Sequence, residues 1–166
     1  MMNTPAKIKY LLDANVLIGF SLWKPIALNL NKDFWSKFGD ALARGEWVLL
    51  DIVVKEIKYD RDLMKWCQEQ DKKGLVKKIS DNDKSRGVEI NNQYKMIDEA
   101  TLKSTVDTYL IAYAEANSLG IFSRESPRKF STELYKIPDV CEILNIKRIK
   151  SPKFFAVKFE PFVSEI

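Results

Sequence analysis

Four acidic residues stand where the chain is expected to leave a strand or enter a helix. Asp13 follows the apolar run YLL, Glu56 follows WVLLD, Asp107 opens the segment VDTYLIAYA, and Glu125 follows GIFS. In open α/β sheets, ligands gather outside the carboxyl ends of the strands, so carboxylates delivered there are placed for chemistry. Carboxylates that are brought together raise one another's pKa, and a cation relieves that repulsion. Oxygen ligands of this kind suit Mg²⁺ or Mn²⁺, so the pattern points to a cofactor of that class.

The sequence contains no histidine. This absence excludes Ser-His-Asp and Cys-His catalysis, histidine-based ribonuclease chemistry and HExxH zinc sites. Taken alone, an acid at a strand end also fits a solvated cap, Asp107 fits the first turn of a helix, where the helix dipole favours an anion, and Glu56 fits an exposed helix position. The residues by themselves therefore leave a metal site and a set of ordinary surface acids both open.

The elements that must position these acids alternate along the chain. Strands are expected at 7–12, 47–52 and 121–123, with a last one in IKRI, and helices at 16–20, 31–45, 53–70, 88–101 and 107–117. Residues 71–87 form the most polar stretch and are expected to be an exposed connection, and Pro138 should begin a short helix. Alternating strands and helices predict an α/β fold with a mostly parallel central sheet flanked by helices.

Composition bounds the class of protein. A chain of 166 residues with 46% hydrophobic residues predicts one globular domain, with a core at about 7–150 and a C-terminal extension at 151–166. Cys67 and Cys141 lack CxxC spacing and are expected to be buried reduced thiols of a cytoplasmic protein. The apolar N-terminal run is broken by Asp13 and Asn15, which argues against a signal peptide or a membrane span. Trp23, Trp35, Trp47 and Trp66 could offer stacking surfaces for bases, but core or dimer contacts are the expectation.

These same segments resemble the PIN-domain ribonucleases. YLLDANVLI resembles their opening strand with its first acid and nearby Asn, LDIVVKEI the segment with the second acid, and STVDTYLIAYA the helix with the third. IFSRE is similar to the strand that leads to a Thr-x-Asp element, which is Ser123-Arg124-Glu125 here. DANVLI, the D-x-x-LIAYA helix and KIPDVC are also similar to a bacterial and archaeal PIN-like family of uncharacterised function. The resemblance spans about residues 7–149.

The resemblance implies an α/β/α sandwich and an endoribonuclease that depends on Mg²⁺ or Mn²⁺ and uses metal-activated water. Asp13, Asp107 and Glu125 would hold the cation, and Glu56 would complete the acidic cluster. Many such proteins are toxins that dimerise and are inhibited by a small antitoxin protein. Two departures from the family pattern stand out: Glu125 replaces the commoner Asp, and Ser123 replaces Thr while keeping a hydroxyl.

Further residues are assigned supporting roles. Asn15 and Ser123 could orient a carboxylate or a bound water, and Asp139, in the first turn of the short helix, is a further candidate beside the metal. Arg124, Arg128 and Lys129 adjoin Glu125 and are predicted to contact the RNA phosphates. Asn15 also fits a plain turn residue, and Asp139 a plain helix-start acid.

Two other classes of function remain as alternatives. A PIN-like fold that keeps its acids could serve as a non-catalytic RNA-binding or assembly module, whose effect should not require Mg²⁺ or Mn²⁺. Phosphotransfer on a haloacid-dehalogenase or receiver-like fold also places an Asp after the first strand. Position 15 is Asn and no acidic pair precedes Asp13, which argues against the phosphotransfer class.

Overall fold

The computed structural model describes residues 9–150, and it contains helices and short strands in alternation. The strands are β1 (Tyr10–Leu12), β2 (Trp47–Leu50), β3 (Val76–Lys77), β4 (Gly120–Phe122) and β5 (Arg148–Ile149). The α-helices are α1 (Ala14–Trp23), α2 (Lys32–Ala43), α3 (Asp51–Glu56), α4 (Arg61–Lys72), α5 (Asp81–Gln93), α6 (Thr105–Ala116) and α7 (Ile137–Ile143), with a 3₁₀ turn, η1, at Asn29–Asn31.

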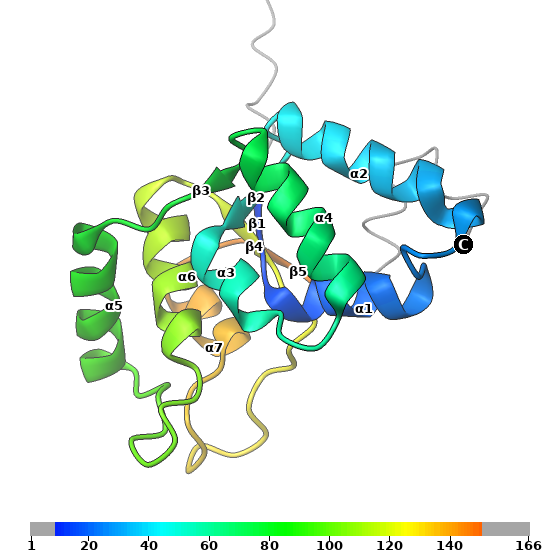
Figure 1. Ribbon diagram of the computed structural model, residues 1–166. Coiled ribbons are helices and arrows are strands. Elements are labelled where there is room, and N and C mark those ends of the chain that lie inside the picture. Colours follow the sequence, from blue (N-terminus) through cyan, green and yellow to red (C-terminus); the bar gives the residue numbers. More distant parts are fainter. Residues whose placement is uncertain (1–8, 151–166) are drawn as a thin grey trace, which may run out of the picture.

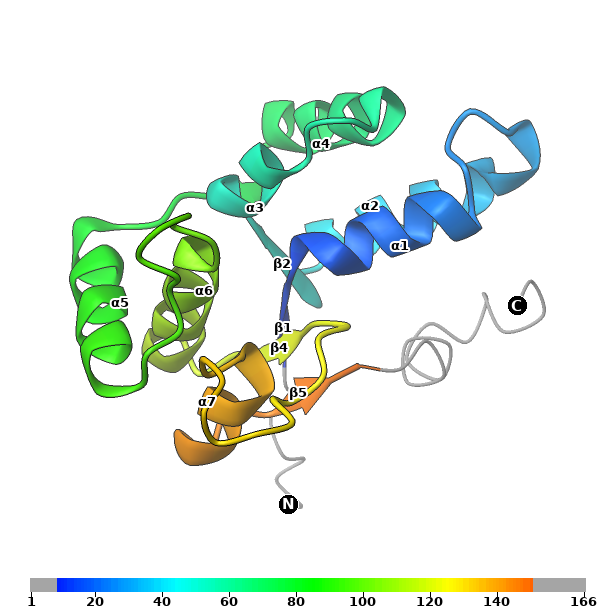
Figure 2. The same ribbon diagram turned by 90° about the horizontal axis from the view of Figure 1, so that it is seen from below.

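The five strands form one sheet in the order β3-β2-β1-β4-β5, and all four pairings are parallel. Figure 1 shows the strands in the middle of the molecule, surrounded by helices. In the view along the strands, α1, α2 and α4 lie on one side and α5, α6 and α7 on the other (Figure 2). The predicted α/β sandwich with a central parallel sheet flanked by helices is therefore confirmed.

Aromatic side chains fill the space between the sheet and the helices α1, α2 and α4. Phe34 and Phe38, one turn apart on α2, are fully buried, and Phe20 of α1 meets Phe38 edge-on at 6.0 Å between ring centroids. Phe122 of β4 makes a similar contact with Phe20. Edge-to-face pairs of this kind add to the stabilisation from burial alone. This packing holds α1, which follows Asp13 in the chain, against β4, which lies beside Asp13 in the sheet.

The expected single helix at 53–70 is wrong, because the chain forms two helices, α3 and α4, separated by an extended link. Ile57 ends α3 in an extended conformation, and Asp60 starts α4 by accepting a hydrogen bond from the Leu63 amide at 2.9 Å. An Asp cap of this kind begins a new helix rather than continuing the old one. Apolar residues recur at helical spacing on both sides of the link, so the sequence pattern predicted one continuous helix.

The segment 71–101 also differs from expectation. Residues 71–87 are more than a connection, because they contain β3 and the start of α5, where Ser80 and Asp83 form a reciprocal capping box. The helix expected at 88–101 ends at Gln93. There the Asn91 side chain accepts the amides of Met96 and Ile97, both at 2.9 Å, and turns the chain away from the helix axis.

Other features bear on the predicted class of protein. Cys67 and Cys141 are both buried and free, as expected. No helix within residues 9–150 combines the length and the apolar character needed to cross a membrane. The C-terminal extension at 151–166 lies outside the described residues.

Candidate active site

The first site residue, Asp13, directly follows the central strand β1 and lies beside the end of β4. Its backbone amide donates to the carbonyl of Phe122 at 2.9 Å, which continues the β1–β4 ladder by one residue. Beside it, the hydroxyl of Ser123 donates to Asp13 Oδ2 at 2.8 Å. Asp13 is only 6% exposed and Ser123 is fully buried, so this hydrogen-bonded pair is shielded from solvent at the carboxyl ends of β1 and β4.

Sheet topology explains why the acid is placed here. The chain goes from β1 to β2 and β3 on one side, and then crosses to β4 and β5 on the other side of β1. The strand order therefore reverses between β1 and β4. Crevices that bind ligands in open α/β sheets lie at such a switch point, outside the carboxyl ends of the strands. Asp13 and Ser123 occupy that position.

Asn15 and Ser123 connect the Asp13 carboxylate to the segment that carries Glu125. Asn15 Nδ2 approaches Ser123 Oγ at 3.4 Å, and Asn15 Oδ1 accepts the Arg124 amide at 3.0 Å. Ser123 Oγ also accepts the Glu125 amide at 3.2 Å. These contacts set the course of the chain after β4. Ser123 reaches the Asp13 carboxylate, whereas the Asn15 side chain contacts Ser123 and the Arg124 amide.

Asp107 lies in the first turn of α6 and is largely shielded from solvent. Burial raises its pKa to about 8, with further contributions from the charges of Asp13, Glu125 and Glu56, while a hydrogen bond from the Ser104 side chain opposes the shift. Ser104 adopts a left-handed backbone conformation with φ 69° just before the helix. That conformation is uncommon for a residue with a side chain, and here it starts α6 with Asp107 facing the other acids.

Glu56 is the last residue of α3 and remains partly exposed. Partial burial and the charge of Asp13 raise the pKa of Glu56 to about 7, and the charge of Lys58 acts in the opposite direction. Lys58 was not singled out in the sequence. Its position two residues after Glu56 was the one feature of the sequence that could have indicated its effect on that acid.

Glu125 joins the cluster from the segment that follows β4. Its Oε2 accepts the Ile137 amide at 3.3 Å at the start of α7, and burial together with the charges of Asp13 and Asp139 raises its pKa. Asp139 itself accepts the amides of Lys136 at 2.9 Å and Arg128 at 3.2 Å. Asp139 therefore holds the 128–136 loop against α7 and acts on Glu125 through charge.

The four acids thus form one electrostatic unit, because the charge of Asp13 raises the pKa of Glu56, Asp107 and Glu125 alike. Within residues 9–150, however, no three acidic or cysteine side chains are gathered closely enough to hold a metal ion directly. Mg²⁺ commonly keeps several waters and binds through one or two carboxylates. The donor set therefore fits a hydrated cation better than a closed cage of protein ligands.

The three basic residues assigned to RNA phosphates differ in their surroundings. Arg128 is already occupied, because its Nη1 donates to the carbonyls of Ser131 and Glu133 and its guanidinium lies 3.7 Å from the centre of the Tyr135 ring. Arg124 is exposed and lies over Gly19, where any Cβ would collide with its guanidinium. The Lys129 side chain is also exposed. Arg124 and Lys129 remain available for a ligand, whereas Arg128 has a structural role.

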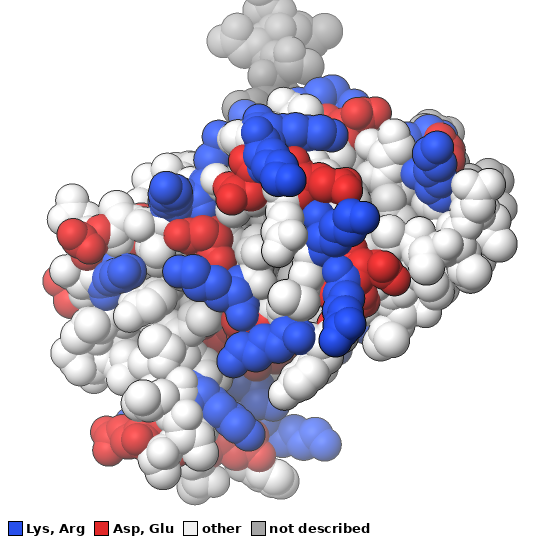
Figure 3. Space-filling view, viewed as in Figure 1, with Lys and Arg blue, Asp and Glu red and all other residues white. Residues whose placement is uncertain are grey.

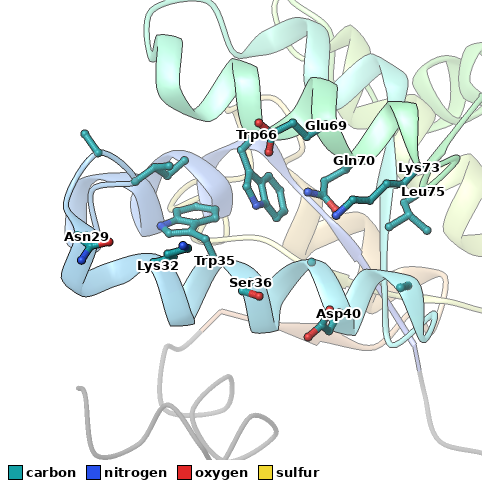
Figure 4. Close-up of a pocket in the computed structure, with 14 residues that line it drawn as sticks. Asn29, Lys32, Trp35, Ser36, Asp40, Trp66, Glu69, Gln70, Lys73 and Leu75 are labelled. Atoms are coloured by element: carbon teal, nitrogen blue, oxygen red, sulfur yellow. The ribbon is translucent and has the colours of Figure 1, made fainter.

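Charged side chains of both signs are interspersed over the face shown in Figure 3. A cavity of about 400 Å³ lies between α2 and α4, away from the four acids, and Trp35 and Trp66 lie side by side in its lining (Figure 4). These two indoles are buried and meet at 5.1 Å between ring centroids. Trp47 is buried as well, which confirms the expected core role for three of the four tryptophans, while Trp23 is partly exposed.

Comparison with known proteins places the sequence in a family. Residues 10–159 match the family described as "Domain of unknown function (DUF4411)". The chain belongs to this family. No curated protein and no solved structure matches the sequence. A function for this DUF4411 chain must therefore be inferred from the chemistry of its own residues.

Some contributors to the site in the DUF4411 chain were missed by sequence reasoning. Ser104 lowers the pKa of Asp107, and Lys58 lowers the pKa of Glu56. Lys136 has the same effect on the pKa of Glu125. The Ser104 side chain bonds to Asp107 without capping the helix. Proximity in the sequence could have indicated Lys58, but Lys136 comes near Glu125 only through the 125–137 loop.

Proposed function

We propose that this chain is a PIN-type endoribonuclease that depends on Mg²⁺ or Mn²⁺ and acts in the cytoplasm as the toxin of a toxin–antitoxin pair. The observation that carries the proposal is the coupling of four acids around Asp13, at the switch point between β1 and β4. Acids with pKa values raised to about 7 and about 8 are unfavourable when ionised near neutral pH, and a cation relieves this. A small antitoxin protein and a second copy of the chain are the further partners we propose.

Asp13, Asp107 and Glu125 would hold a hydrated cation, in part through its bound waters, with Glu56 contributing directly or through a water. When bound, the cation would neutralise the carboxylates and increase the acidity of a water for attack on phosphorus. Ser123 donates to one oxygen of Asp13 and would thereby keep that carboxylate oriented beside the cation or its water. Arg124 and Lys129 would hold the RNA backbone near the acids.

The decisive experiment is cleavage of a single-stranded RNA by the purified chain. We expect products only when Mg²⁺ or Mn²⁺ is present, with 5′-phosphate and 3′-hydroxyl ends, and none when a chelator is in excess. RNA binding that persists with the chelator and is never followed by cleavage would contradict the nuclease and favour the non-catalytic module.

Glu125 provides a sharper prediction, because it is one methylene longer than the Asp of the family pattern. Glu125→Gln preserves the shape and its acceptor for the Ile137 amide but removes the charge, so Mn²⁺ affinity and cleavage should fall together, by roughly 10–100-fold. Glu125→Asp keeps the charge, and a water can span the gap, so it should lose less than the Gln variant. Isothermal titration with Mn²⁺ and a cleavage assay on both variants measure this.

Glu133→Gln is the matched control, because Glu133 is an exposed acid of the same loop whose side chain accepts the Lys129 amide. If Glu125→Gln bound Mn²⁺ and cleaved RNA like the unaltered protein, Glu125 would lie outside the metal site and Asp139 would become the better candidate.

A further inference from the structure

One aromatic side chain lies almost entirely in solvent. Tyr59, in the link between α3 and α4, is 97% exposed, more than any other large hydrophobic residue described in the structure. An exposed aromatic ring of this size has no packing role in the fold. Its surroundings must explain why the chain presents it.

The backbone that carries Tyr59 is fixed on both sides. Ile57 is buried in the core, and Asp60 caps α4 through the Leu63 amide. Asp60 also accepts a hydrogen bond from the hydroxyl of Ser21, a buried residue of α1. Lys58 and Tyr59 are therefore the two residues that project from an anchored link, so the ring is held in place without being covered.

Basic residues flank Tyr59 along the chain. Lys55, Lys58, Arg61 and Lys65 are all exposed, and none of them forms an ion pair with a residue between positions 9 and 150. On the face seen in Figure 3, Lys and Arg side chains gather over α3 and α4, with acidic side chains among them. Arg61, Lys65 and Lys72 follow one stripe of α4, about 16 Å long at 1.5 Å per residue.

This surface begins at the candidate active site. Glu56 belongs to the acidic cluster, and the charge of Lys58 acts on it directly. Tyr59 follows Lys58, and the basic stripe of α4 starts two residues later. A strand of nucleic acid cut at the acids could thus continue over Tyr59 and along α4.

We propose that Tyr59 is a stacking platform for one base of single-stranded RNA, with Lys58, Arg61 and Lys65 holding the phosphates on either side. The proposal rests on the function proposed above, and it names the form of RNA that the site accepts. A projecting aromatic ring beside cations matches the way proteins bind unpaired bases, which expose a π-face that a duplex hides. Double-stranded RNA would contact the cations alone.

The test is fluorescence anisotropy with a labelled single-stranded RNA and with a duplex of the same length. The full chain is used in an Asp13→Asn background with Mg²⁺, so that cleavage does not remove the probe. Tyr59→Ala should weaken single-strand binding by between about 5-fold and 150-fold and leave duplex binding within about twofold. Tyr59→Phe should bind like the parent, because the ring survives.

Lys58→Gln and Lys65→Gln separate charge from stacking. Each should weaken binding to both forms of RNA, and each should reduce the slope of log affinity against log salt by about 0.7 for the single strand. Tyr59→Ala should leave that slope unchanged. Leu30→Ala is the matched control, because Leu30 is 76% exposed on η1, outside the α3–α4 link, and its removal should change nothing.

Equal single-strand affinity in Tyr59→Ala and the parent would overturn the stacking proposal, and so would an equal loss for the duplex. If the unaltered protein cleaves RNA while Tyr59→Ala binds normally, only the platform is wrong. If the unaltered protein never cleaves but Tyr59→Ala still loses single-strand binding, the platform stands and the nuclease is wrong.

Discussion

Replacing Asp13 by asparagine is expected to reduce RNA cleavage by roughly three orders of magnitude while leaving the protein folded. Asp13 is the acid whose charge acts on Glu56, Asp107 and Glu125, so its removal changes the whole cluster rather than one member. The amide oxygen introduced by Asp13→Asn could still accept from Ser123, and one repelling charge disappears. Thermal unfolding without metal should therefore be unchanged or occur at a slightly higher temperature.

The measurement combines an initial cleavage rate with a thermal melt of the same preparation. Asp40→Asn is the matched control, because Asp40 is an exposed acid on α2 with no place in the cluster. A variant that cleaves at the unaltered rate would exclude Asp13 from catalysis. A fall in rate that merely follows the loss of folded protein would make Asp13 a structural residue.

The second large effect is a loss of stability with rising pH in the protein without metal. Carboxyl groups of the unfolded chain ionise near pH 4, whereas folding raises the pKa of Glu56 to about 7 and of Asp107 to about 8. Between these values the folded state holds protons that the unfolded state has released. Stability must therefore fall as pH rises from about 4 to about 8, and the trend ends once both states are ionised.

Asp107→Asn should remove much of this dependence, because the neutral amide does not ionise. At pH 8.5 without metal we expect the variant to unfold at a temperature about 3–10 °C above the unaltered protein, or roughly 1–3 kcal/mol. Saturating Mn²⁺ should raise the melting temperature of the unaltered protein by more than that of the variant. A pH-independent melting temperature between pH 5 and 8 would contradict the proposed electrostatic cluster.

A helix or strand of this fold could be predicted where residues close together in the sequence determine where it begins and ends. The strand β1 and the helix α6 follow from apolar runs with acids at their ends, and both lie close to where the sequence indicates. The break between α3 and α4 depends on the side-chain cap at Asp60 and on the burial of Ile57 in the core. The spacing of apolar residues along the sequence indicates neither of these features. The strand β3 has two residues and pairs only with β2 among the described strands, so nothing local distinguishes it.

The candidate site likewise has features that the sequence predicts and features that only tertiary contacts determine. That acids at the ends of strands come to the same edge of the sheet follows from parallel topology, which the alternation of elements predicts. That Asp139 holds the 128–136 loop and that Arg128 is occupied by Ser131, Glu133 and Tyr135 are consequences of how one irregular loop folds back. Loop geometry of that kind is set by tertiary contacts, which a single sequence does not display.

The reversal of strand order at β1 divides the acids between two pieces of chain. Asp13 and Glu56 precede the irregular 94–104 segment, and Asp107 and Glu125 follow it, so neither piece carries more than half of the cluster. The β1–β4 ladder and the packing of α5 against α6 join the two pieces. A chain divided in that segment would be a two-fragment system, in which the raised carboxyl pKa values exist only while the fragments are joined.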